Sequence, residues 1–92
     1  MEKIHILIFG QVQGVGFRIS TARKARQLGL TGWVKNLPEG QVEAFFEGKK
    51  QDIEEILFWC HQGPDKAQVD KIEIKTKLQT ISRQFDRFEI KR

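Results

Sequence analysis

A glycine-rich stretch near the N-terminus, GQVQGVGFR at residues 10–18, joins two segments whose apolar residues follow different periods. Residues 3–10, KIHILIFG, alternate apolar side chains in the manner of a strand with two fairly apolar faces. From Arg18 onwards, apolar or small residues recur at three-residue spacing, and Gly29 supplies a helix stop signal. One glycine would suffice to turn a strand into a helix, and this stretch contains three.

The rest of the chain continues the alternation of strands and helices. Further strands are predicted at 31–36, 41–48, 67–78 and 84–92, and a second helix carries apolar residues at Ile53, Ile56, Leu57 and Cys60. We expect Ile72 and Ile74 to point inward, and the last strand to use Phe88 and Ile90 as its apolar residues. The order is β-α-β-β-α-β, with the last strand region in two pieces. This order predicts an α+β, ferredoxin-like sandwich with an antiparallel sheet covered on one face by two helices.

Size and composition limit the class of protein. With 92 residues, the chain is long enough for one domain, predicted to span 1–92, that buries about two-thirds of its unfolded surface without staples. Its one cysteine, Cys60, cannot form an internal bridge and lacks the neighbours of a zinc site. The apolar run at the N-terminus is too short for a signal peptide or a membrane span. We expect a soluble, cytoplasmic protein whose net charge of +4 favours anionic partners in general.

The junction between the first strand and the first helix is a candidate anion site. Such a junction presents backbone N–H groups and the positive end of a helix dipole, which suit a phosphate-sized anion. Glycines accept positive φ and let the backbone approach a ligand closely. The spacing of Gly10, Gly14 and Gly16 matches neither the P-loop nor the dinucleotide-binding motif. On the glycines alone, a tight turn that leads into a helix is an equally good interpretation.

Arg18 favours the anion site. A cation in the first turn of a helix opposes the macrodipole, which costs about 0.3–1 kcal/mol at a surface. An anion bound between Arg18 and the loop N–H groups would remove the conflict, because a guanidinium can bind two phosphate oxygens at once. The alternative is that Arg18 points to solvent or pairs with Glu43 or another acid.

Asn36 ends the predicted strand at 31–36. Asparagine is a common turn residue, and that structural interpretation is the simpler one. The functional interpretation is a neutral amide near a phosphate, whose oxygen can orient water without adding a repelling charge.

The other polar residues offer no familiar catalytic arrangement. His5 lies in a strand and His61 at a helix end, with no serine or cysteine relay suggested by spacing. We expect the carboxylates to be scattered over solvent faces rather than paired. Any catalysis therefore has to come from positioning and electrostatics at the loop.

Two motifs of this chain resemble those of the acylphosphatases. The family signature G-x-V-Q-G-V-x-F-R is matched by GQVQGVGFR at 10–18, and the segment G-W-V-x-N by GWVKN at 32–36. The resemblance continues through EGQVEAFFEG and the GPDKAQVDKIEI region to the closing FDRFEIKR, so it covers essentially the whole chain.

The resemblance implies a hydrolase that cleaves the carboxyl–phosphate bond of acyl phosphates without metal or cofactor. Arg18 and the loop would hold the phosphate, and Asn36 would orient the attacking water. The loop residues that match the family's phosphate-binding segment are Gln11, Val12, Gln13, Gly14, Val15, Gly16 and Phe17. Inorganic phosphate is then an expected product and competitive inhibitor of a monomeric enzyme that binds no membrane.

The chain also departs from the family pattern. Ile19-Ser20 stands where many members carry an aromatic, and Phe85 stands where a tyrosine is frequent. Leu37-Pro38 follows the asparagine, as in microbial members, where animal members commonly have threonine or serine. These positions affect the acyl side of the site or its packing, and they leave the acyl-group preference and the rate open.

Two binding functions are the alternatives. An RNA-binding module can have the same order of elements, but it stacks bases on aromatic residues of an exposed sheet face. Here the predicted outward set of the third strand is Gln41, Glu43, Phe45 and Glu47. Two acids around one ring do not favour nucleic acid. The second alternative is an anion-binding domain without turnover, of the kind found inside larger hydrogenase-maturation proteins, whereas we expect this chain to be complete in itself.

Overall fold

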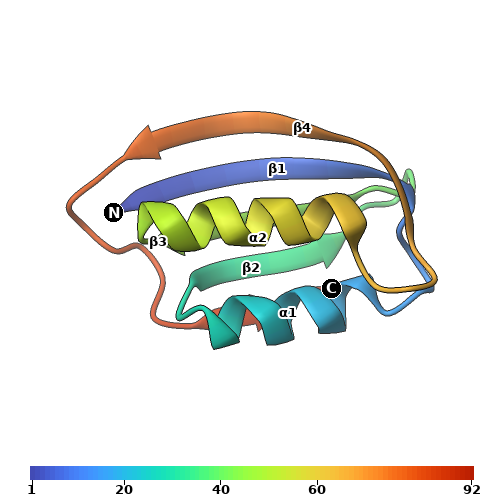
Figure 1. The fold of residues 1–92 in the computed structure, drawn as a ribbon, viewed down its shortest axis with the longest axis horizontal. Helices are drawn as coiled ribbons and strands as arrows, with labels where there is room; N and C mark the ends of the chain where they lie inside the picture. The colour runs from blue at the N-terminus through green and yellow to red at the C-terminus, as the bar shows by residue number, and fades with distance from the viewer.

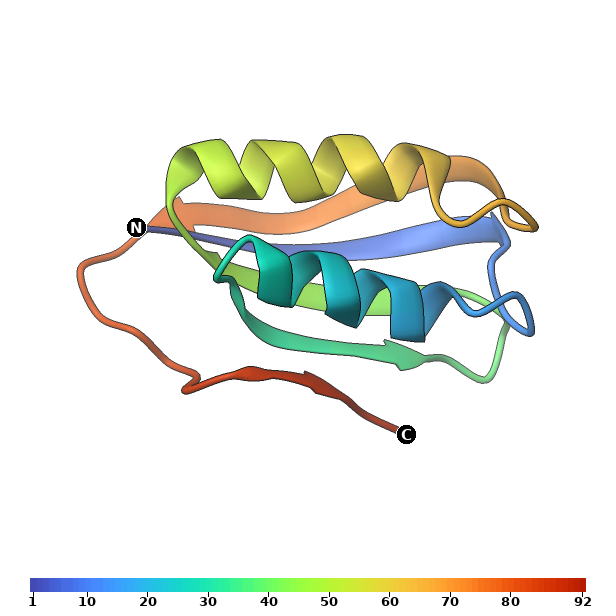
Figure 2. The ribbon, with the colours of Figure 1, turned by 60° about the horizontal axis from the view of Figure 1, so that its bottom comes forward.

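The computed structural model describes all 92 residues, which form two helices and a five-stranded sheet. The elements are β1 (Glu2–Gln11), α1 (Phe17–Gln27), β2 (Thr31–Asn36), β3 (Val42–Gly48), α2 (Lys50–Gln62), β4 (Gln68–Gln79) and β5 (Phe88–Ile90). The strands lie in the order β4-β1-β3-β2-β5, and both helices cover the same face of the sheet (Figures 1 and 2). The predicted ferredoxin-like sandwich is confirmed.

The core lies between the helices and the sheet, where the predicted periodicities place it. Alternate residues of the two central strands are completely buried: Ile4, Ile6 and Ile8 in β1, and Val42, Ala44 and Phe46 in β3. The helical residues Ile53, Ile56 and Cys60 are equally buried on the inner side of α2. A period of two in the strands and about 3.6 in the helix therefore orients both apolar sets toward one layer.

The last two strands lie at opposite edges of the sheet. β4 is antiparallel to β1, whereas β5 is parallel to β2, so the sheet is mixed rather than wholly antiparallel as predicted. The chain leaves β4 at the end of the sheet where β2 begins and crosses to the far edge (Figure 1). A strand that starts at that end runs in the direction of β2. Only Phe88–Ile90 of the predicted strand at 84–92 forms β5.

Glu47 corrects the prediction that the carboxylates lie on solvent faces. Its side chain is fully buried and accepts a hydrogen bond of 2.8 Å from the Thr31 hydroxyl. It also accepts hydrogen bonds from the backbone N–H groups of Gln84, at 3.0 Å, and of Phe85, at 2.6 Å. Alternation places Glu47 on the face opposite the helices, but the crossover to β5 covers that end of the face. The buried carboxylate thereby anchors the crossover, because charge-assisted hydrogen bonds to backbone N–H groups are strong.

Two isoleucines predicted to be apolar anchors are more exposed than expected. Ile74 pairs with Ile6 on the helix side, yet it is 51% exposed, because β4 is an outer strand with a neighbour on one side only. Ile90 in the opposite outer strand is 39% exposed, whereas Phe88 in the same strand is buried.

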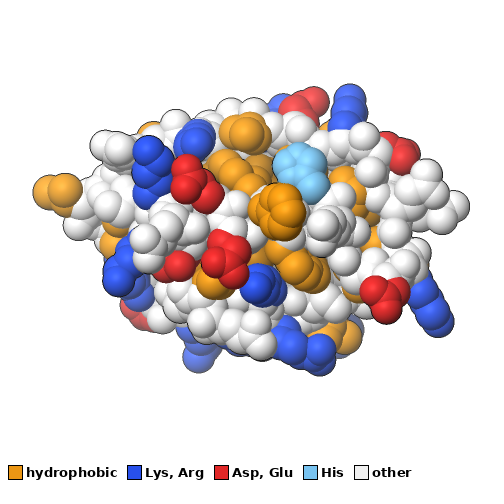
Figure 3. Space-filling view, viewed as in Figure 1, with side chains coloured by type: hydrophobic (Ala, Val, Ile, Leu, Met, Phe, Trp, Pro, Cys, Tyr) orange, Lys and Arg blue, Asp and Glu red, His pale blue; other side chains and the backbone are white.

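The helices present a mixed surface to solvent. Figure 3 shows apolar side chains gathered over α2, with lysines, arginines and acids of both helices and neighbouring loops around them. Phe58 in α2 is 69% exposed. Neither helix is long and apolar enough to cross a membrane.

Candidate active site

The three glycines of the loop after β1 have two different roles. Gly14 and Gly16 have φ angles of 76° and 77°, in the left-handed region, although a Cβ at either position would meet no atom within 4 Å. At these two positions glycine is required by conformation rather than by space. Gly10 also has a positive φ, 132°, and in addition its Cβ would lie 2.1 Å from the carbonyl oxygen of Gln68. Gly10 thus lets β4 approach β1, and only the other two shape the loop itself.

The loop and the first turn of α1 present unused hydrogen-bond donors. None of the backbone N–H groups of residues 12–19 donates a hydrogen bond within the protein. The helix starts after Gly16 without a side-chain cap, and its first turn contains no acid. Unpaired N–H groups at the positive end of a helix dipole form a donor set suited to a phosphate-sized anion.

Arg18 and Asn36 meet at a cavity of about 180 Å³ beside this loop. The loop, the start of α1 and the end of β2 lie at one end of the sheet (Figures 1 and 2). The residues that line the cavity are Val12, Gly14, Gly16, Phe17, Arg18, Ile19 and Asn36. Of the loop residues predicted to bind phosphate, Gln11, Gln13 and Val15 do not line it. The structure therefore brings together two side chains that are separated by a helix and a strand in the sequence.

Asn36, which lines this cavity, has a side-chain oxygen without a partner. Its Oδ1 is buried and has no hydrogen-bond partner in the protein. Buried polar atoms are nearly always paired, so the unpaired oxygen of a residue that lines the cavity needs an explanation, which a bound water or ligand can supply.

Arg18 has no acidic partner. Its Nη1 donates a hydrogen bond of 3.3 Å to the carbonyl oxygen of Lys91, and none of its nitrogens forms a salt bridge. Glu43, the suggested alternative partner, instead contacts His5 at 2.6 Å and Lys35 at 3.6 Å. The alternative in which Arg18 is neutralised by Glu43 is wrong. The guanidinium keeps its charge available to the cavity.

Gln13 has a role that the sequence did not suggest. Its Nε2 donates hydrogen bonds to the carbonyl oxygens of Leu37, at 2.8 Å, and Gln41, at 2.9 Å. These two residues flank the turn that follows Asn36. The Gln13 side chain therefore ties the glycine loop to the segment that carries Asn36. No spacing in the sequence signals this contact, because its partners are backbone atoms of a distant turn.

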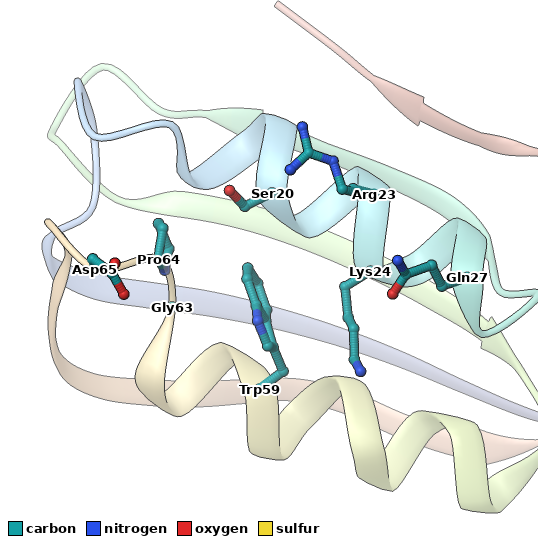
Figure 4. Close-up of a pocket in the computed structure, with 8 residues that line it drawn as sticks. All are labelled: Ser20, Arg23, Lys24, Gln27, Trp59, Gly63, Pro64 and Asp65. Carbon is teal, nitrogen blue, oxygen red and sulfur yellow. The ribbon is translucent and has the colours of Figure 1, made fainter.

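Other reactive groups lie outside this site. Burial raises the pKa of the Cys60 thiol far above its usual range, which keeps it protonated and unreactive. No three His, Cys, Asp or Glu side chains gather as metal ligands would. A groove of about 370 Å³ between α1 and α2 (Figure 4) is lined by Ser20, Arg23, Lys24, Gln27, Trp59, Gly63, Pro64 and Asp65. None of the predicted site residues lines this groove. Its one lysine, Lys24, forms a salt bridge of 3.0 Å with Glu55.

Fold and site together define a ferredoxin-like α+β sandwich with an anion-binding junction between its first strand and first helix. Comparison with known proteins specifies the family, because the family model for acylphosphatase matches residues 4–90. The chain belongs to the acylphosphatase family.

Similar proteins carry the same description. An acylphosphatase of Methylococcus capsulatus is 42% identical over 92 residues, which cover 100% of this chain and 98% of that protein. An acylphosphatase of Trichormus variabilis is 53% identical over 73 residues, 79% of this chain and 72% of the relative. The crystal structure of acylphosphatase from Bacillus subtilis matches with a TM-score of 0.93 at 32% identity, over 100% of both chains. The chain is accordingly an enzyme that hydrolyses acyl phosphates, and the turnover-free binding module is not favoured.

The Gln13 contact leads to a testable prediction. Gln13→Met keeps the side-chain length but removes both donors, and each such hydrogen bond is worth about 0.5–1.5 kcal/mol. We expect kcat/KM for an acyl phosphate to fall about tenfold in Gln13→Met, because the glycine loop and Asn36 are then no longer held at a fixed distance from each other. Gln13→Lys restores a donor group of similar reach and is expected to recover most of the activity. Equal losses in both variants would contradict a role for the two hydrogen bonds.

Proposed function

We propose that Arg18 and the N–H groups of the loop hold the phosphate of an acyl phosphate, while Asn36 positions the attacking water. The observation that carries this proposal is the cavity lined by both Arg18, which has no acidic partner, and Asn36, whose amide oxygen has no hydrogen-bond partner in the protein. The size of the cavity, about 180 Å³, suits a phosphate group and a water. The matching family motifs support the same roles.

The reaction requires little covalent help from the protein. Asn36 Oδ1 accepts a hydrogen bond from the water, whose oxygen lone pair then points at phosphorus. As the water oxygen bonds to phosphorus, the bond between phosphorus and the acyl oxygen breaks, and the carboxylate leaves with the electron pair. The protons of the water end on the phosphate and in solvent. A carboxylate is stable at neutral pH, so no strong general base is needed.

Electrostatic stabilisation is the main contribution of the protein. Negative charge spreads over the three equatorial oxygens of the phosphoryl group in the transition state. Arg18 and the N–H groups of residues 12–19, which have no acceptor within the protein, would stabilise that charge with little reorganisation. An amide at position 36 adds no negative charge beside the phosphate, which a carboxylate would do.

Phosphate release from acetyl phosphate tests the proposal. We expect turnover well above the buffer rate, unaffected by a metal chelator, and competitive inhibition by inorganic phosphate, which would occupy the same cradle. A wild-type protein that releases no phosphate above buffer contradicts the function. If the protein turns over acetyl phosphate but phosphate inhibits non-competitively, the proposed phosphate-binding site is wrong while the hydrolase function stands.

We also infer that residues 1–92 act as one domain, as a monomer in the cytoplasm. One sheet and one continuous buried cluster support the single domain. A single buried thiol fits a reducing compartment.

A further inference from the structure

The outer strand β5 connects the two elements that carry the proposed catalytic residues. It pairs with β2, which ends at Asn36, and it runs beside α1, which carries Arg18 in its first turn (Figure 2). The strand is only three residues long and has a neighbouring strand on one side only. An edge strand leaves one row of its backbone N–H and C=O groups unpaired. On that side, the contacts with α1 are therefore what hold β5 in place.

Arg26, in the last turn of α1, makes two of these contacts. Its Nε and Nη2 donate hydrogen bonds of 3.2 and 2.9 Å to the carbonyl oxygen of Phe88. Carbonyl groups alternate in direction along a strand, and the Arg87 carbonyl accepts a hydrogen bond from the Gly32 N–H of β2 at 3.0 Å. The Phe88 carbonyl therefore points away from β2, to the side where no strand can pair with it. Arg26 takes the place of that strand, and it forms no salt bridge.

Arg18 contacts the other end of β5. Its Nη1 donates a hydrogen bond of 3.3 Å to the carbonyl oxygen of Lys91, the residue that follows the strand. The N–H of Lys91 in turn donates to the carbonyl oxygen of Val34 in β2 at 2.8 Å. A guanidinium has five N–H donors in one plane. The bond to Lys91 uses one of them, which orients the plane and leaves the others for a phosphate.

The two contacts are similarly spaced on the helix and on the strand. Arg26 follows Arg18 by eight positions, about 12 Å along a helix. Lys91 follows Phe88 by three positions, about 10 Å along a strand. The later residue of the helix contacts the earlier residue of the strand, so α1 and β5 run in opposite directions. Contacts at both ends hold β5 at one position along α1, which a single contact would not do.

We propose that Arg26 is a positioning residue for the cavity lined by Arg18 and Asn36, the inner cavity. Arg26 holds β5 along α1, and thereby keeps the Lys91 carbonyl where it orients the guanidinium of Arg18. Arg26 does not line the inner cavity and would not touch the substrate. The inference rests on the proposed function, since it takes Arg18 as the residue that holds the phosphate.

Arg26→Gln tests this role. Glutamine is a good helix former, and the buried Phe88 ring stays stacked on Phe46, 5.4 Å between ring centres, so the variant should fold. We expect kcat/KM for acetyl phosphate to fall about fivefold, because a misplaced group loses part of its effect. The inhibition constant of inorganic phosphate should rise by a similar factor. Rates are measured below the thermal midpoint of each variant.

The same substitution in an Arg18→Lys background separates positioning from a general loosening of the fold. A lysine ammonium is a point charge on a flexible stem, so it depends less on a fixed orientation than a guanidinium does. Arg26→Gln should then lower kcat/KM by less than about twofold, although it should lower the thermal midpoint equally in both backgrounds. An equal loss of kcat/KM in both backgrounds would overturn the proposal, because Arg26 would not act through Arg18.

Two matched variants serve as controls. Lys24→Gln removes a different side-chain contact of α1, the 3.0 Å salt bridge to Glu55 of α2, and leaves the contacts with β5 intact. It should keep kcat/KM and the phosphate inhibition constant within about 1.5-fold of the wild type, as suits an exposed ion pair. Arg26→Lys can still donate a hydrogen bond to the Phe88 carbonyl and should recover most of the loss. Equal losses in Lys24→Gln and Arg26→Gln would contradict a specific role for Arg26.

The outcomes separate the positioning role from the function. If Arg26→Gln keeps both wild-type values while the wild type hydrolyses acetyl phosphate, the positioning role is wrong and the hydrolase function stands. If the wild type releases no phosphate above the buffer rate, the proposed function itself is wrong.

Discussion

Arg18→Ala is expected to lower kcat/KM for acetyl phosphate by about 1,000-fold or more. In GTPases, an arginine that stabilises the charge of the transferring phosphoryl group is worth about 10³–10⁵ in rate. Arg18 is the only charged residue that lines the inner cavity, so the chain has no substitute for it. The inhibition constant of inorganic phosphate should rise steeply as well, because the Arg18 guanidinium is expected to bind phosphate in the ground state too. Initial-rate kinetics with phosphate as inhibitor measure both effects.

Two further variants show whether charge, geometry or folding explains the loss. Arg18→Lys keeps the positive charge but cannot bind two phosphate oxygens at once as a guanidinium does. Its kcat/KM should therefore lie between that of Arg18→Ala and that of the wild type. Arg23→Ala removes another cation of α1 that does not line the inner cavity and should leave kcat/KM within about twofold. If Arg18→Ala binds phosphate as well as the wild type does, Arg18 is not the phosphate clamp.

Arg18→Ala should lose activity without a matching loss of thermal stability. The substitution removes a cation that opposes the helix dipole, an effect of about 0.3–1 kcal/mol, and loses one 3.3 Å hydrogen bond to Lys91. These effects nearly cancel, so the thermal midpoint should change little. A large drop in the midpoint would instead point to a structural role.

The local patterns of the sequence predicted the layers of the fold well. The period-two pattern of residues 3–10 and 41–48 identifies the two central strands, whose inner sets are fully buried even though the outer faces also carry apolar residues. The direction of β5 was not predictable in this way, because it depends on where the chain crosses the sheet and not on any local period. The burial of Glu47 follows from the same crossover, which covers a face that alternation alone leaves open to solvent.

The site was predictable to a different extent. A cation opposing the dipole marked Arg18, but nothing in the spacing joins it to Asn36. The resemblance to a family supplied that link, and the cavity lined by both residues agrees with it. The Gln13 contacts remained hidden, because they depend on backbone atoms that only the fold brings near the loop.

Both proposed catalytic residues are locally unfavourable in the protein without its ligand. Arg18 opposes the dipole of its own helix, and Asn36 buries an oxygen without a partner. Natural sequences tolerate such conflicts mainly at functional sites, where the ligand relieves them. A phosphate would relieve the first conflict and a water the second.

Asn36→Ala is expected to lower kcat by about 100- to 1,000-fold, the range seen when one positioned polar group is removed from an active site. The inhibition constant of phosphate should stay within about threefold of the wild type, because Asn36 is proposed to hold the water and not the anion. The thermal midpoint should be unchanged or higher, since the substitution removes an unpaired buried oxygen.

Asn36→Asp and Gln41→Ala separate this role from general effects of a buried amide. Aspartate keeps the shape but places a negative charge beside the phosphate, so it should weaken phosphate binding as well as lower kcat. Gln41 also has a buried, unpaired amide oxygen, but it does not line the cavity. Gln41→Ala should therefore keep kcat, while its backbone carbonyl still accepts the hydrogen bond from Gln13. If Asn36→Ala and Gln41→Ala lowered kcat equally, the loss would reflect the packing of the turn, and the orientation of water by Asn36 would be the wrong explanation.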